Sequence, residues 1–149
     1  MADKFAELPE KHELALGQWL AAHAGVKAAF GANPVRIRSA VDDRSEMPCI
    51  QTGEDGFRPA DRQGVAARVV TSRIHIWTRE SGMILLKRIG GAVSGALTIT
   101  DVDGVNNGFD VAGFRLVFGE MVLEKYMRDP TENVRHGVLD FEMRFEPAA

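Results

Sequence analysis

The chain is poor in cysteine, and Cys49 is the only one among its 149 residues. A single cysteine excludes a disulfide within the chain and leaves no cysteine set for a structural zinc ion. Long apolar runs are also missing, since none approaches the roughly 20 residues that a helix needs to cross a bilayer. Residues 1–13 are polar and acidic and lack the features of a secretory signal. We therefore expect a protein made and kept in a reducing cytosol, with no membrane partner.

An excess of positive charge is absent as well. Lysine and arginine together number 18, aspartate and glutamate number 21, and the net charge is −3. Strong, salt-sensitive binding to the outside of duplex DNA needs clustered basic side chains that neutralise phosphates. The composition therefore argues against strong binding to the outside of duplex DNA.

Motifs for catalysis or metal binding are equally scarce. Residues 101–107 hold closely spaced oxygen ligands, but the glycine comes too early for a calcium loop and the closing glutamate is missing. His75 and Glu80 are close in sequence, yet neighbours along a strand rarely have the reach and orientation that acid–base catalysis needs. The serines lack the context of a nucleophile elbow. We expect no catalytic residue, no metal and no cofactor.

The strongest positive signal lies in residues 68–97, RVVTSRIHIWTRESGMILLKRIGGAVSGAL. Ile74 and Ile76 alternate with polar or aromatic neighbours, which predicts a half-buried strand. Ser81 then interrupts the pattern and can cap a helix through its hydroxyl. The apolar residues that follow recur at helical spacing and predict the buried face of that helix: Leu85, Leu86, Ile89, Ala92, Val93, Ala96 and Leu97.

The rest of the chain predicts one domain over residues 1–149. We expect a first helix from Pro9 to about Ala24, a helical turn at 26–30, and strands at 35–38, 48–53, 97–102, 114–127 and 137–145. Period-two alternation in the last strand points four apolar residues to one face: Leu139, Phe141, Met143 and Phe145. This order predicts an α+β fold, a largely antiparallel sheet with two main helices packed on one face.

Three glycines interrupt the second main helix, at Gly90, Gly91 and Gly95. Each costs about 1 kcal/mol relative to alanine inside a helix. Close packing of the helix backbone within the subunit is the plainer explanation, and packing against a second subunit is the alternative.

A strand that reads HIWTRESG and passes directly into such a helix resembles the tail-completion family of long-tailed bacteriophages. Members are also called tail terminators, and relatives occur in gene transfer agents. The resemblance covers most of the chain in order: WLAAH in the first helix, the strand MPCIQTGED, and the C-terminal strand pair from residue 113. In relatives the turn between the last two strands often reads D-x-D-G-x-x-H. Here residues 129–136 are longer and altered but still end on His136.

The resemblance implies a structural virion protein without catalytic residues. Such a protein forms a ring, generally a hexamer, on the last ring of the tail tube. It stops tube growth and joins the tail to the head connector, or stopper, at the tail–neck junction. DNA would pass through the pore without specific binding, and assembly would take place in the host bacterial cytoplasm.

Residues 54–64, EDGFRPADRQG, are polar and turn-rich and are expected to form a long exposed loop that contacts the tube or the adjacent ring. Phe57 would supply an exposed apolar anchor among charges of both signs. The candidate interface residues are Glu54, Asp55, Phe57, Arg58, Asp61 and Arg62. The candidates for the rim of a neutral or acidic pore are Asp42, Asp43 and Glu46.

Two other functions stay open at this point. A different neck component, such as a head-completion, connector or stopper protein, would follow the same ring logic. A small α+β enzyme or ligand-binding domain would need polar residues converging on inward faces, and the sequence shows no such set.

Overall fold

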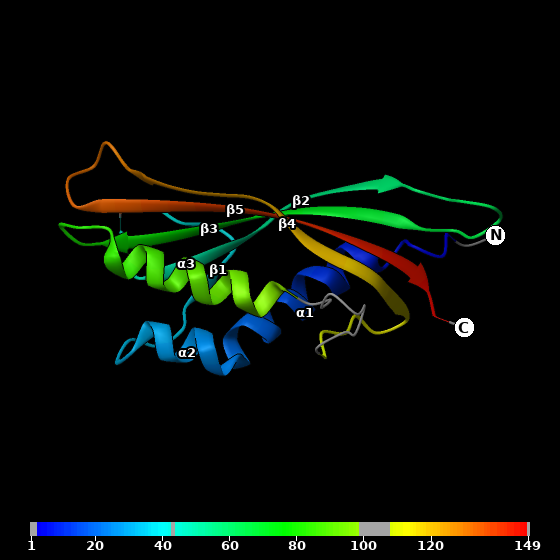
Figure 1. Cartoon of the computed structure of the whole chain (residues 1–149), viewed down its shortest axis with the longest axis horizontal. Coiled ribbons are helices and arrows are strands. Elements are labelled where there is room, and N and C mark those ends of the chain that lie inside the picture. Colours follow the sequence, from blue (N-terminus) through cyan, green and yellow to red (C-terminus); the bar gives the residue numbers. More distant parts are fainter. Residues whose placement is uncertain (1–2, 43, 99–107, 149) are drawn as a thin grey trace.

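The computed structural model describes residues 3–42, 44–98 and 108–148. Its elements are α1 (Leu8–Ala22), α2 (Ala24–Phe30), β1 (Ile37–Arg38), β2 (Cys49–Pro59), β3 (Arg68–Arg79), α3 (Ile84–Leu97), β4 (Phe114–Arg128) and β5 (Val134–Pro147). The strands form one sheet in the order β1-β2-β3-β5-β4, and the helices lie on one face of it (Figure 1). Within these residues, the short β1–β2 pair alone is parallel. The predicted α+β fold, with a largely antiparallel sheet, is confirmed.

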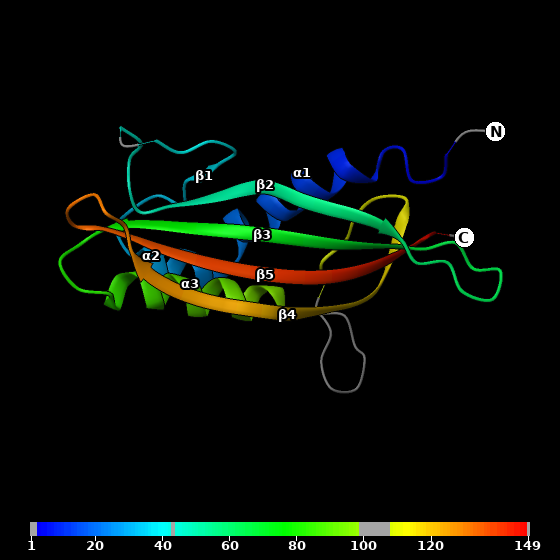
Figure 2. The same cartoon turned by 90° about the horizontal axis from the view of Figure 1, so that it is seen from above.

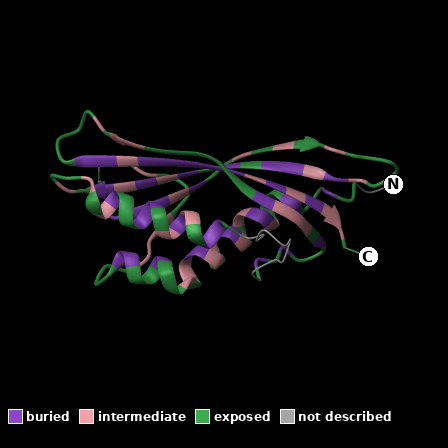
Figure 3. Ribbon diagram, viewed as in Figure 1, coloured by how far each residue is buried: buried purple, intermediate pink, exposed green. Residues whose placement is uncertain are grey.

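The core lies between the helices and one face of the sheet (Figure 3). On α3 the predicted stripe is correct, because Leu86, Ile89 and Val93 are fully buried. Leu85 is half-buried at the margin of the same cluster. The sheet meets this stripe with its own predicted apolar residues, all of them buried: Ile74, Ile76, Leu139, Phe141, Met143 and Phe145. Each such side chain stabilises the fold by about 1.5–3 kcal/mol relative to an exposed one.

The start of α3 differs from the expectation. Ser81 does not cap the helix; the Glu80 carboxylate instead accepts from the backbone N–H groups of Leu85 (3.1 Å) and Leu86 (3.0 Å). The Thr78 hydroxyl donates to the same carboxylate at 2.6 Å. Ser81 lies too far ahead of Ile84, where the helix begins, whereas the longer glutamate side chain reaches its free amides.

The predicted loop at 54–64 is wrong. Strand β2 continues to Pro59, and the chain reverses only at Arg62–Val65, where the two backbones exchange hydrogen bonds of 3.0 and 2.8 Å. The two central residues of this turn, Gln63 and Gly64, have positive φ angles of 48° and 80°, as a tight hairpin turn with the twist of its strands requires. The segment is poor in apolar residues because much of this hairpin is exposed, not because it is irregular.

The three helix glycines have different surroundings. A Cβ on Gly90 would lie 2.5 and 2.6 Å from ring carbons of Tyr126 on β4, so close packing within the subunit is correct there. Around Gly91 and Gly95 no other part of the described chain lies within 4 Å of such a Cβ, so the same explanation fails for the described residues. The strand expected at 97–102 begins inside α3, and its residues from 99 on lie outside the described residues, as does the calcium-like segment 101–107.

Candidate interaction surfaces

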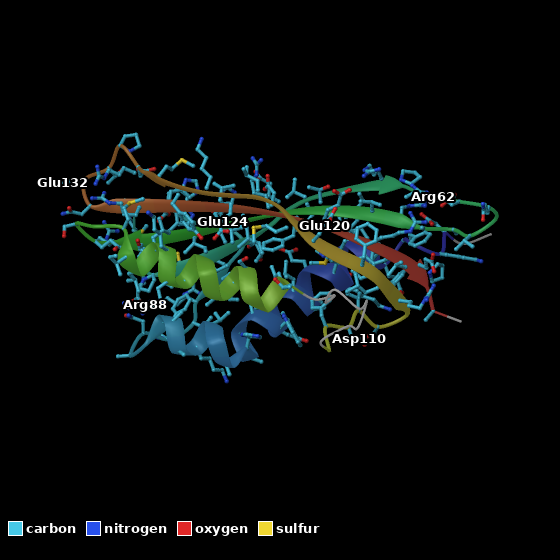
Figure 4. All side chains as sticks on the ribbon, viewed as in Figure 1. Arg62, Arg88, Asp110, Glu120, Glu124 and Glu132 are labelled. Carbon is cyan, nitrogen blue, oxygen red and sulfur yellow. The ribbon has the colours of Figure 1, made fainter. Side chains whose placement is uncertain are left out.

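The molecule is elongated along its strands and presents two ends (Figures 1 and 2). The first end is the β2–β3 hairpin, residues 60–67, with Arg62 near its tip. The second end combines the β4–β5 turn at 129–133 with the loop at 39–48 that precedes β2. Figure 4 places Arg62 and Glu132 at opposite ends of the sheet.

Three of the six candidate interface residues meet at the first end. Arg58, Asp61 and Arg62 line a hollow of about 560 Å³ on the helix-free face, together with Phe118 of β4 and Arg144 of β5. The hairpin is ordered by its own side chains. The Asp61 carboxylate accepts from the Ala67 backbone N–H at 2.8 Å and lies 3.5 Å from the Arg68 guanidinium. The first end is therefore a structured, charged projection.

The other three candidates are elsewhere along β2. Glu54 lies on the helix-free face, 3.1 Å from the His75 ring. Asp55 points toward the helices, and its side chain is only 8% exposed. Phe57 packs half-buried against the core, so it is not the exposed apolar anchor that the sequence suggested. The predicted set is thus divided between one end of the sheet and the middle of a strand.

A serine, a histidine and an aspartate meet beneath the sheet. The Ser72 hydroxyl lies 3.5 Å from His12 Nε2, and His12 Nδ1 lies 3.9 Å from the Asp55 carboxylate. His12 is fully buried and Ser72 is 1% exposed. Burial lowers the pKa of His12 to about 4 and raises the pKa of Asp55, while a hydrogen bond with Ser72 acts against the latter shift.

These three residues have the composition of a hydrolytic triad. They lack its exposure to substrate and its hydrogen-bond arrangement. A nucleophilic serine must be reachable by substrate and must donate to the histidine. Here Ser72 is enclosed, and its hydroxyl is a partner of the Asp55 carboxyl. His12 Nδ1 and Asp55 Oδ1 are buried without a hydrogen-bond partner among the described residues. The trio is a polar insertion in the core and is not an active site.

The helix-free face of the sheet carries charges that neutralise one another. The Arg73 guanidinium donates to both oxygens of Asp140 at 2.8 and 3.1 Å. Arg58 pairs with Glu142 at 2.7 Å. Arg115 pairs with Glu146. Paired charges reduce the attraction of this face for a polyanion, although each exposed pair adds little stability.

Toward the second end, three rings lie side by side on the same face. Trp77 stacks on His136 with ring centroids 3.8 Å apart, and His75 Nδ1 lies 2.7 Å from His136 Nε2. Burial, with a smaller effect of His75, lowers the pKa of His136 to about 4. The sequence placed His75 and Trp77 on one strand face but could not supply His136, because that residue reaches them only through the β3–β5 register.

The candidate rim residues lie in the loop at the second end. Asp42 is exposed, and its carboxylate accepts from the Arg44 backbone N–H at 2.9 Å. Together with Trp77 and Asp129 it lines a hollow of about 170 Å³. Glu46 pairs with Arg36 at 3.0 Å. Asp43 lies outside the described residues.

Neither a metal site nor a membrane-spanning helix is found in the part of the chain that the structure describes. No group of three His, Cys, Asp or Glu side chains there is arranged to bind a metal ion. No helix within those residues is long and apolar enough to cross a membrane.

The sequence model of one protein family, described as "Tail completion protein gp17", matches residues 14–146. The chain belongs to the tail completion protein family. In structure it is similar to a chain of the "Virion of native gene transfer agent (GTA) particle", with a TM-score of 0.73 and 23% sequence identity. That alignment covers 90% of this chain and 93% of the other, and at this identity it shows a shared fold. No curated protein matches the chain.

Membership of the tail completion family makes the chain a structural protein of a phage-type particle, as the HIWTRESG resemblance implied. A family of structural virion proteins argues against an enzymatic role.

Proposed function

We propose that this tail completion protein is the tail terminator of a phage or gene transfer agent particle. A ring of identical subunits, six in number, caps the head-proximal end of the tail tube, stops its growth and joins it to the head connector or stopper. The family match over residues 14–146 carries the proposal. The two ends of the long sheet, which expose different loops, suit a protein that contacts different partners along one axis.

In this arrangement the first end contacts the tail tube. Asp61 and Arg62 offer opposite charges on an ordered hairpin, beside a hollow with Phe118 in its wall. A rigid polar rim around a small apolar surface is the usual composition of an interface. The second end then faces the connector, and Asp42 and Glu46 of its loop lie at the pore rim, with Asp43, outside the described residues, as the third candidate.

The helix-free face of the sheet lines the pore. Three of its arginines, at positions 58, 73 and 115, are each paired with a carboxylate from β5, while Arg144 of the same face lines the hollow at the first end. DNA therefore passes without specific binding, since tight binding would require unneutralised basic side chains. A cryo-electron microscopy map of the ring checks this point, and a lumen dominated by lysine and arginine would contradict it.

The decisive experiment removes the protein from a producing strain and measures tail length by electron microscopy. We expect tubes of uncontrolled length and heads without tails, and purified protein should restore both. Tubes of normal length that fail to join heads would instead identify another neck component, such as a stopper. Normal joined particles would refute the proposal.

A second experiment tests the two ends separately. Arg62→Glu should reduce binding to isolated tubes while the ring still forms. Glu132→Lys, a matched charge reversal at the other end, should leave tube binding unchanged and reduce joining to heads. Equal effects of the two variants on tube binding would show that the ends have no distinct partners.

A further inference from the structure

The flank formed by α3 and β4 exposes apolar side chains in an unusual concentration. Strand β4 is an edge of the sheet, and no other strand of the described residues pairs with its outer side. Residues 120–125 are six consecutive exposed residues. Among them Met121, Val122 and Leu123 are 38%, 57% and 43% exposed. An edge strand with adjoining exposed apolar residues typically marks a contact with another chain.

A β-bulge in β4 helps to expose the apolar triplet Met121, Val122 and Leu123. The register between β4 and β5 shifts between Met121 and Leu123, so Val122 is the extra residue of a β-bulge without a partner on β5. A bulge bends the edge and re-aims its side chains, and it discourages open-ended strand pairing. The contact that this edge favours is therefore through side chains.

Helix α3 continues the same surface. The Ser94 hydroxyl lies 3.9 Å from Met121 Sδ, which joins the helix to the triplet. Ile84, at the start of α3, is 70% exposed. Among the described residues nothing packs on Gly91 and Gly95 of this helix, so no contact there offsets their cost in helix stability. A partner that packs closely on α3 beside the triplet would explain them.

The opposite flank of the molecule carries α1, next to β2 (Figure 2). Leu14 of α1 is 58% exposed and can supply an apolar counterpart. The charges of the two flanks are complementary. The α1 flank holds three glutamates against one lysine, at Glu7, Glu10, Glu13 and Lys11. Apart from Arg115, which is paired with Glu146, the exposed charges of α3 and β4 are four cations against two carboxylates: Lys87, Arg88, Lys125 and Arg128 against Glu120 and Glu124, some of them labelled in Figure 4.

We propose that the α3–β4 flank of one subunit binds the α1 flank of a second copy of this chain, with Val122 and Leu14 in the contact. Two different surfaces on opposite sides of a subunit make a heterologous contact, and such contacts generate a ring when the rotation closes. The inference rests on the proposed ring. It assigns the sides of the subunit to its neighbours and leaves the two ends free for the tube and the connector.

The test compares Val122→Asp with Val65→Asp, a matched control at an exposed valine in the β2–β3 turn, outside both flanks. The mass of each variant is measured by light scattering in solution without tail tubes, because Val65 belongs to the end that is proposed to contact the tube. A buried, unpaired carboxylate is strongly unfavourable in an interface. We expect Val122→Asp to lower the ring fraction on the order of tenfold or more, with unchanged circular dichroism. Val65→Asp should assemble like the wild type.

Cysteine pairs then identify the partner surface. Cys49 is buried and does not compete. Oxidation of the Leu14→Cys, Val122→Cys double variant should give a ladder of covalent oligomers, whereas each single variant should not. Normal rings from Val122→Asp, or covalent dimers from the Val122→Cys single variant, would overturn this contact and leave the terminator proposal standing. A wild-type protein that is monomeric both in solution and on tubes would overturn both.

Discussion

Replacing Gly90 with alanine tests whether α3 is held against β4 by direct contact. The new methyl group would lie 2.5 and 2.6 Å from carbons of the Tyr126 ring, where an ordinary contact is 3.4 Å or more. The ring also lies beside Gly137 of β5, where an added Cβ would be 3.2 and 3.3 Å from the same ring. Its hydroxyl is also bonded to Glu124. Tyr126, helix α3 or both must therefore shift.

The magnitude follows from two opposing terms. Overpacking costs about 1–3 kcal/mol, and removing a glycine from a helix interior returns about 1 kcal/mol. The free energy of unfolding should thus fall by up to about 2 kcal/mol in Gly90→Ala. The adjacent Gly91→Ala gains the helix term without a clash, since nothing lies within 4 Å of its Cβ. It should be more stable than the wild type by up to about 1 kcal/mol.

The assay is urea denaturation followed by circular dichroism, at a concentration where the protein is monomeric. That condition matters because Gly91 lies on the proposed subunit contact. The comparison of neighbouring glycines removes differences in helix length and position. If Gly90→Ala proved as stable as Gly91→Ala, the packing of α3 on Tyr126 would not be the constraint on this helix.

Three further predictions concern the core, the cap and the buried histidine. Ile89→Ala should lower the free energy of unfolding by about 2–5 kcal/mol, and a change below about 0.5 kcal/mol in denaturation would show that this face is not core. Glu80→Ala should cost about 1–2 kcal/mol by removing the helix cap, whereas Ser81→Ala should be near neutral in the same assay. His12 should make the protein less stable in acid. The unfolded chain takes up its proton near pH 6.5 and the folded chain only near 4, so stability falls as the pH drops between these values, by up to about 3 kcal/mol. The Asp55 carboxyl, with its raised pKa, acts in the opposite direction, so its contribution falls as the pH rises above its ordinary value. In melting curves across that range His12→Asn should flatten the slope, and an unchanged slope would exclude this source.

The period-two and helical patterns predicted most of the fold. Elements that bury one face between the sheet and the helices carry apolar residues at the spacing of that element. Ile74, Ile89 and Leu139 were each placed on the correct face. The β2–β3 hairpin was missed because it is largely exposed. Polar residues such as Arg58 then occupy positions on both faces, and the alternation of apolar residues is absent. Its tight turn depends on the positive φ angles of Gln63 and Gly64, which cannot be read from amino-acid composition.

The interaction surfaces were harder to predict. The sequence grouped Glu54, Phe57 and Asp61 because they are neighbours along the chain, yet side chains alternate between faces of a strand and separate such neighbours. The ring stack needs His136 opposite Trp77, and this pairing depends on a register between strands about 60 residues apart. Glu80 was considered only as a partner for His75, and its place as a helix cap needs the exact start of α3.

The strands of the sheet also determine how the molecule bears force. Strands β3 and β5 are paired residue by residue over twelve positions, from Arg68 with Phe145 to Arg79 with Val134. If the two ends hold different partners, a pull between tail and head runs along the strands. The ladder is then loaded in shear, so many hydrogen bonds must break together, whereas a sideways pull would open them one at a time. If the subunit joins tail and head as proposed, it is therefore mechanically strongest along the line between its two ends.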